Sequence, residues 1–176
     1  MPQHNMFTIN ELYRMLNVWS QRVRHTARGI EHFTAAEHAL LAYLSLDLIM
    51  EDDGLVQLIA ASRAEHALSA QLAETLRRWG VQDTPDIIDR ARTLYQQHGA
   101  AIRAAAERNG NIEELRAQFP QFDPLDADYC IACEEDFCTI CSYVRRHPAD
   151  FAQLAAAAGQ VNSPLPPVQP ASLFPA

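Results

Sequence analysis

Residues 34–51, TAAEHALLAYLSLDLIME, decide the fold class of this chain. They begin with a capping box, Thr34-Ala-Ala-Glu37, in which the threonine and glutamate side chains each satisfy a backbone N–H at the start of a helix. Beyond it, apolar side chains occur on most sides of the helix rather than along one stripe. A helix with that pattern is usually the buried centre of a helical protein. We therefore expect a helix over about 35–51 with other helices packed around it.

Helices also account for most of the chain on either side of this segment. Start and stop signals predict helices over about 9–28, 64–79, 85–108, 111–118 and 126–146, with a short apolar piece over 55–61 and a last short helix ending at Gly159. The proline-containing stretch 119–124 reads as a rigid turn. The sequence thus predicts an all-α single domain over 1–159, built from six or seven helices. Residues 160–176 contain five prolines and no charge, which is typical of an extended or flexible tail.

The charge balance restricts the possible partners. The 176 residues carry 22 acids against 14 bases, a net charge of −8, and every one of the bases is arginine. Such a chain is a poor direct binder of nucleic acid, which requires a phosphate-neutralising surface, and it suits a basic partner. No signal-peptide pattern opens the sequence, and no apolar run approaches the 20 or so residues of a membrane span. We expect a cytoplasmic protein with reduced thiols and no contact with a membrane.

The acidity is concentrated in one segment. Residues 107–136 hold nine acids and two arginines, a net charge of −7, so this segment carries nearly all of the net charge. Carboxylates held several ångströms apart on a rigid helix resemble a phosphate backbone to a basic protein. The alternative is a solvated acidic face that serves only solubility. The candidate partner-binding residues are Glu107, Glu113, Glu114, Asp123, Asp126, Asp128, Glu134, Glu135 and Asp136.

Four cysteines at positions 130, 133, 138 and 141 form two CxxC pairs separated by only four residues. At about 100° per residue they share one side of a continuous helix with Phe137, Ile140 and Val144. Because such a helix holds its ends far apart, four thiolates cannot meet at one zinc ion. We expect the cysteines to be core residues with no metal or other cofactor, and Cys138→Ala to destabilise the protein. A small metal or redox protein is the alternative.

Catalytic motifs are absent from the sequence, which contains no His-Glu-x-x-His, no Glu-x-x-His and no Gly-x-Ser-x-Gly. The one unusual carboxylate is Asp47, inside the most apolar helix. It could be a catalytic acid, but such a group more often pairs with an arginine or histidine, or faces a gap. The sequence therefore favours a protein that is not an enzyme.

Several motifs in order resemble the bacterial DNA mimic protein 19 family. They are LRRWG at 76–80, YQQH at 95–98, QFPQFDPLD at 118–126, EEDF at 134–137, YV at 143–144 and HPADF at 147–151. The turn DGLVQLI at 53–59 is similar to the family's glycine-rich turn, although Asp53 replaces a glycine. The cysteines and the proline-rich tail also depart from the family pattern.

The resemblance implies an all-helical acidic homodimer without catalytic residues. Its surface carboxylates would imitate DNA phosphates and occupy the DNA-binding face of a transcription regulator. Arginines at 14, 22, 24 and 28 make the first expected helix basic, so the mimic surface should exclude it. The alternative is a helical interaction or housekeeping protein whose acidity serves solubility alone.

Overall fold

The computed structural model describes residues 32–108 and 110–154, and these residues are helical with no strand among them. The all-α prediction is confirmed. The expected helix over 9–28 and the tail over 160–176 lie outside the described residues. The elements in chain order are α2 (Ala35–Asp52), α3 (Gly54–Ala60), α4 (Ala64–Ala67), α5 (Ala70–Trp79), α6 (Thr84–Arg108), α7 (Ile112–Gln118), a 3-10 turn η2 (Pro120–Phe122), α8 (Asp123–Arg146) and a second 3-10 turn η3 (Pro148–Phe151).

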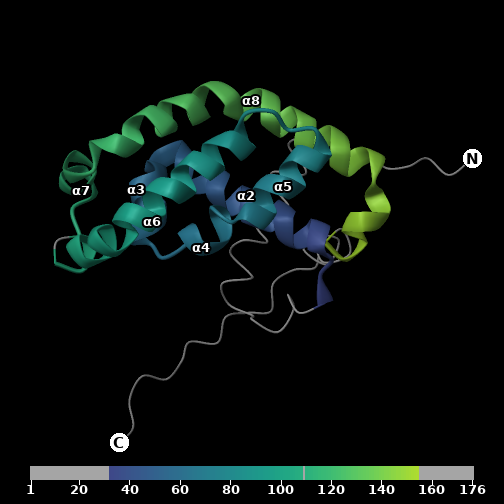
Figure 1. The fold of residues 1–176 in the computed structure, drawn as a ribbon. Helices are drawn as coiled ribbons and strands as arrows, with labels where there is room; N and C mark the ends of the chain where they lie inside the picture. Colours follow the sequence, from purple (N-terminus) through teal and green to yellow (C-terminus); the bar gives the residue numbers. More distant parts are fainter. Residues whose placement is uncertain (1–31, 109, 155–176) are drawn as a thin grey trace, which may run out of the picture.

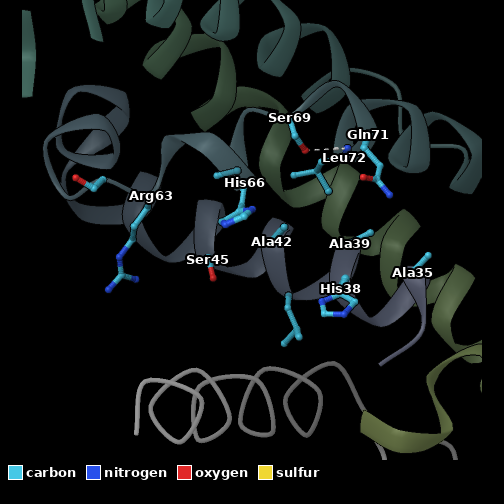
Figure 2. Close-up of a pocket in the computed structure, with 13 residues that line it drawn as sticks. Ala35, His38, Ala39, Ala42, Ser45, Arg63, His66, Ser69, Gln71 and Leu72 are labelled. Carbon is cyan, nitrogen blue, oxygen red and sulfur yellow. Dashed lines mark hydrogen bonds between the residues drawn. The ribbon is translucent and has the colours of Figure 1, made fainter. Parts of the chain in front are cut away.

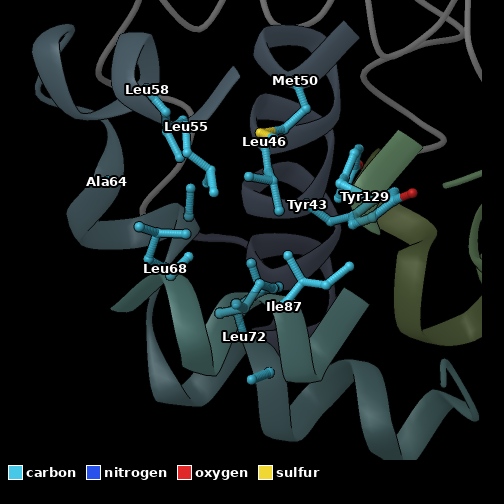
Figure 3. Packing of buried hydrophobic residues seen from close by; sticks show 14 of the residues in the cluster. Tyr43, Leu46, Met50, Leu55, Leu58, Ala64, Leu68, Leu72, Ile87 and Tyr129 are labelled. Atoms are coloured by element: carbon cyan, nitrogen blue, oxygen red, sulfur yellow. The ribbon is translucent and has the colours of Figure 1, made fainter. Parts of the chain in front are cut away.

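Helix α2 is central, as its sequence predicts. The Thr34 side chain accepts a hydrogen bond from the backbone N–H of Glu37, and the Glu37 carboxylate accepts one from that of Thr34. Along the helix, Leu40, Tyr43 and Leu46 are buried, and α2 packs on α3, α4, α5 and α8. Figure 3 shows Tyr43, Leu46 and Met50 pointing from α2 into this apolar cluster.

The predicted helix over 64–79 is wrong in one respect, because the structure divides it into α4 and α5. The break falls at Leu68 and Ser69. Leu68 is buried, and the Ser69 hydroxyl accepts a hydrogen bond from the N–H of Leu72 to begin a new helix. A serine competes for local backbone donors in this way, so it favours a helix start over a helix interior. Gly80 ends α5 in the left-handed conformation, with φ of 92°, as the sequence indicates.

The long helices α6 and α8 lie side by side, with short α7 at the end of the molecule where α6 ends and α8 begins (Figure 1). Helix α7 has the predicted cap, in which the Asn111 side chain accepts from the N–H groups of Glu113 and Glu114. Helix α8 begins at Asp123, three residues earlier than expected. Pro124 lies in its first turn, where the missing N–H is not needed for a helical hydrogen bond, so the proline does not stop this helix.

The prediction that all four cysteines are core residues is wrong for two of them. Cys141 is buried and Cys133 half-buried, but Cys130 and Cys138 are exposed. The buried side of α8 instead consists of Leu125, Tyr129, Ala132, Asp136, Ile140 and Cys141. At 100° per residue, the five of these residues other than Cys141 have a mean direction about 120° from Cys130 and about 160° from Cys138. The sequence pattern pointed to the wrong side of α8 because Asp136, which its charge predicts to be a surface residue, is one of the buried residues.

Candidate functional site

Six of the nine candidate acids lie exposed on the surface. They come from the end of α6, the first turn of α7 and the length of α8, and comprise Glu107, Glu113, Glu114, Asp123, Glu134 and Glu135. We call these six residues the acidic surface. Within the described part of the chain, five of them form no salt bridge or side-chain hydrogen bond, and Glu114 accepts a hydrogen bond from Asn111. The charges of these five are therefore open to a partner.

Carboxylates follow the solvent side of α8 in two rows. At 100° per residue, Asp123 and Glu134 share one row, and Asp128 and Glu135 share another row about 120° away. These four acids extend over about 18 Å of helix axis, or one charge per about 4.5 Å, at a rise of 1.5 Å per residue. One strand of duplex DNA carries one charge per about 3.4 Å of axis. The charge density along α8 is thus comparable to that of a single phosphate backbone.

Asp128 is the weaker member of its row because an arginine already neutralises it. Arg90 of α6 donates a hydrogen bond to Asp128 Oδ2 at 2.7 Å, and both side chains remain about half exposed. An exposed ion pair of this kind contributes little to stability and is screened by salt. A basic partner would therefore have to compete with Arg90 for this carboxylate.

Two acids outside the 107–136 segment are paired with arginines. Arg77 lies 2.6 Å from carboxylate oxygens of both Asp86 and Asp89, and Arg92 lies 2.8 Å from Asp89. Burial alone would raise the pKa of Asp89, but the hydrogen bonds and charges of Arg77 and Arg92 together outweigh it, so the pKa is held below its ordinary value. This network joins α5 to α6 and cancels its own charge.

Asp126 has a structural position rather than a surface one. Its Oδ1 accepts a hydrogen bond from the N–H of Leu55 at 2.9 Å, and Oδ2 lies 3.6 Å from the guanidinium of Arg116. Burial raises the pKa of Asp126 above its ordinary value, against the opposing effects of that hydrogen bond and of Arg116. Gly54, with φ of 76°, approaches so closely that a Cβ there would lie 2.5 Å from Asp126 Oδ2. The carboxylate therefore joins α3 to α8.

Asp136 lies in the interior, with 2% of its surface exposed. Its two oxygens accept hydrogen bonds from the N–H of Gln82 at 3.2 Å and of Thr84 at 2.7 Å, at the start of α6. A carboxylate at a helix start satisfies backbone donors that have no partner within the helix. Because a partner cannot reach a buried carboxylate without unfolding the start of α6, we remove Asp136, together with Asp126, from the surface that we propose below.

Asp47 is buried on α2 and is hydrogen-bonded to a tyrosine, whereas the sequence analysis suggested an arginine, a histidine or a gap. The Tyr129 hydroxyl donates a hydrogen bond to Asp47 Oδ1 at 2.6 Å. Tyr43 lies near this pair, and burial, followed by the charge of Asp47, raises its pKa far above the ordinary value. The pair links α2 to α8 within the core. Among the described residues, no group of three or more histidine, cysteine or acidic side chains is arranged to hold a metal ion.

Ile131 is a surface feature that the sequence analysis missed. It is 83% exposed and lies on α8 between the two rows of carboxylates. The signal was present in the spacing, since Asp128, Glu134 and Glu135 are three or four residues away and helix neighbours at that spacing share a face. The solvent side of α8 thus combines acidic rows with one large apolar side chain.

Fold and surface together define a class: an all-helical protein that presents exposed carboxylates from one end of a bundle and along one long helix. No described helix is long and apolar enough to cross a membrane. The model of the DMP19-like protein family matches residues 31–147, and the chain belongs to this family. A curated relative, DNA mimic protein DMP19 from Neisseria meningitidis serogroup B (strain ATCC BAA-335 / MC58), is 32% identical over 147 residues, which cover 83% of this chain and 89% of the relative.

Proposed function

We propose that this protein is a non-enzymatic DNA mimic whose acidic surface binds the DNA-binding face of a basic regulator or another DNA-binding protein. The observation that carries the proposal is the set of exposed carboxylates on α7 and α8. The four acids of α8, with Asp128 counted although it is paired with Arg90, have a charge density close to that of one DNA strand. Membership of the DMP19-like family and the name of the Neisseria relative support it. The mechanism is competition, because the partner's arginines and lysines cannot contact DNA and the mimic at the same time.

The six exposed acids are the residues proposed to imitate phosphates, with Asp128 contributing once Arg90 is displaced. Coulombic attraction between exposed groups is screened beyond about 8 Å at physiological ionic strength. Complex formation should therefore weaken as salt rises. A complex held mainly by apolar contact would not show this dependence.

Competition for a DNA-binding protein is the direct test. The tagged protein first retains its partner from a lysate at low salt, and the recovered DNA-binding protein is then purified. Labelled duplex bound to that partner is titrated with the wild-type protein, and fluorescence anisotropy reports displacement of the DNA. We expect displacement by the wild type and much weaker displacement by the double variant Glu113→Lys/Glu134→Lys.

A matched control separates the acidic surface from net charge. The variant Glu65→Lys/Glu74→Lys changes the net charge by the same amount at two exposed acids on α4 and α5. It should displace DNA as well as the wild type does. If the two double variants behave alike, net charge rather than this surface governs binding. If the wild type displaces DNA from none of the recovered proteins, the mimic proposal fails and the acidity serves solubility.

We also propose a homodimer in the cytoplasm, where its DNA-binding partner would be found. Pressing two acidic surfaces together costs several kcal/mol in like-charge repulsion, so the interface should lie outside the acidic surface. Sedimentation velocity at micromolar concentration should show a dimer for the wild type and for Glu113→Lys/Glu134→Lys alike. A monomer at that concentration would contradict the proposal.

A further inference from the structure

A pocket of about 550 Å³ lies on the side of α2 that α4 and the start of α5 partly cover (Figure 2). Much of its lining is apolar, and the charged or titratable residues that line it are one arginine and two histidines. Its apolar lining includes Ala39, Leu41, Ala42 and Leu72, and its polar lining includes His38 and His66. No described residue of α7 or α8 lines it, so it is separate from the acidic surface.

The pocket continues the apolar side of α2 that the other described helices leave partly open. Leu41, Ala42 and Ser45 are half-buried, and they lie three or four residues apart, which places them on one face of α2. Helix α2 is apolar on most sides, and a helix of this kind requires cover all round. Among residues 32–108 and 110–154, α3, α4, α5 and α8 supply part of that cover.

Residues 9–28 have the pattern that would complete it. Apolar residues recur there at intervals of three and four, which defines one stripe of a helix. The stripe consists of Ile9, Leu12, Leu16, Trp19 and Val23. The four arginines of the segment, at 14, 22, 24 and 28, fall about 90° or more from the centre of the stripe at 100° per residue. The segment is therefore strongly amphipathic, with a basic outer face.

The path of the chain leads from this segment to the pocket. The described chain begins at His32, and Ala35, three residues later, already lines the pocket. A helix over 9–23 is about 21 Å long at 1.5 Å per residue, or four turns. A segment of this length, joined so close to the pocket, has a high effective concentration for docking within the same chain.

We propose that residues 9–28 dock as an amphipathic helix against the α2 pocket of the same chain. The stripe that contains Leu16 and Trp19 covers Leu41 and Ala42, and the four arginines face solvent. Because the pocket shares no lining residue with α7 or α8, docking keeps this basic face apart from the acidic surface. The proposal does not depend on DNA mimicry.

Tryptophan fluorescence of the full chain tests this contact. The chain has two tryptophans; Trp79 is buried in the core, and Trp19 lies on the proposed stripe. The difference in acrylamide quenching between the wild type and Trp19→Phe isolates the signal of Trp19. We expect Trp19 to be protected in the folded wild type and to become as accessible as in urea-unfolded protein when docking is broken.

Two variants break docking from opposite sides. Ala42→Glu places a charge in the pocket, with Ala104→Glu at an exposed position of α6 as its control. Leu16→Glu places a charge on the stripe, with Asn17→Glu on the polar side as its control. Both test variants should raise the accessibility of Trp19 and shift its emission to longer wavelength, and neither control should. Because position 16 lies outside the described core, Leu16→Glu still tests the docking proposal if Ala42→Glu fails to fold.

Two results would overturn the proposal. If Trp19 in the folded wild type is already as accessible as in urea, the stripe is not docked. If Trp19 is protected at high protein concentration but loses protection on dilution, the stripe docks on a second copy rather than within its own chain. Protection that persists on dilution and is lost in Leu16→Glu supports the proposal.

Discussion

The substitution Asp136→Ala should destabilise the fold strongly although its neighbours Glu134 and Glu135 tolerate change. The substitution removes two hydrogen bonds from a carboxylate to the backbone, at Gln82 and Thr84, and leaves the Thr84 N–H buried without an acceptor. Hydrogen bonds to charged groups contribute about 1.5–3 kcal/mol each, and an orphaned buried donor costs about 1–3 kcal/mol. Because these effects overlap, we expect the free energy of unfolding to fall by about 3 kcal/mol.

That loss is large for a domain of this size. Stabilities of about 5–15 kcal/mol are usual, and for 150–250 residues each kcal/mol shifts Tm by about 2–4 °C. We therefore expect Tm to fall by about 6–12 °C. Urea unfolding followed by circular dichroism at 222 nm gives the free energy of unfolding, and a thermal scan gives Tm.

Two further variants make the test specific. Asp136→Asn keeps one carbonyl oxygen as an acceptor and should fall between the wild type and Asp136→Ala. Glu135→Ala, at an exposed position one residue away, should change the free energy of unfolding by about 0.5 kcal/mol or less. If Asp136→Ala and Glu135→Ala are equally stable, Asp136 does not cap α6 and the reasoning from its burial fails.

Three other measurements test the burial of Cys141 and the contact between Asp126 and α3. A thiol reagent at pH 8 should modify exposed Cys130 and Cys138 in the folded protein and spare Cys141, because burial raises the pKa of Cys141 to about 11. Mass spectrometry identifies the labelled residues, and early labelling of Cys141 would contradict its burial. Gly54→Ala should lower the free energy of unfolding by about 1–3 kcal/mol from backbone strain alone, with a further loss because the added Cβ would clash with Asp126. Urea unfolding measures this free energy, and an unchanged unfolding midpoint would refute the close approach of Gly54 to Asp126. Burial raises the pKa of Asp126, so the contribution of this group to stability is greatest at low pH and falls as pH rises through the folded-state pKa. The stability of Asp126→Asn relative to the wild type, measured by urea unfolding, should therefore improve from pH 3 to pH 7. A difference that moves the other way would show that the folded state favours the ionised group.

The solvent side of α8 shows where reasoning from charge succeeds and where it fails. Glu134 and Glu135 are exposed as charged residues usually are, but Asp136 is buried, and no local pattern distinguishes it from the two acids before it. The difference arises because Gln82 and Thr84, more than 50 residues away in sequence, bring two unpaired N–H groups to that point of α8. A long-range contact of the same kind, the hydrogen bond from the Leu55 N–H, holds Asp126 away from the acidic surface.

Sequence alone determined the helical class, because helix periodicity and capping are local. The capping box at Thr34, the left-handed stop at Gly80 and the asparagine cap of α7 each depend on residues within a few positions of one another, and each is confirmed. The concentration of acid over 107–136 is also a property of the chain. Only the tertiary structure decided which acids face solvent, which cysteines are buried, and that Tyr129 is a partner of Asp47. Those outcomes depend on which helices meet, and therefore on contacts between residues far apart in the sequence.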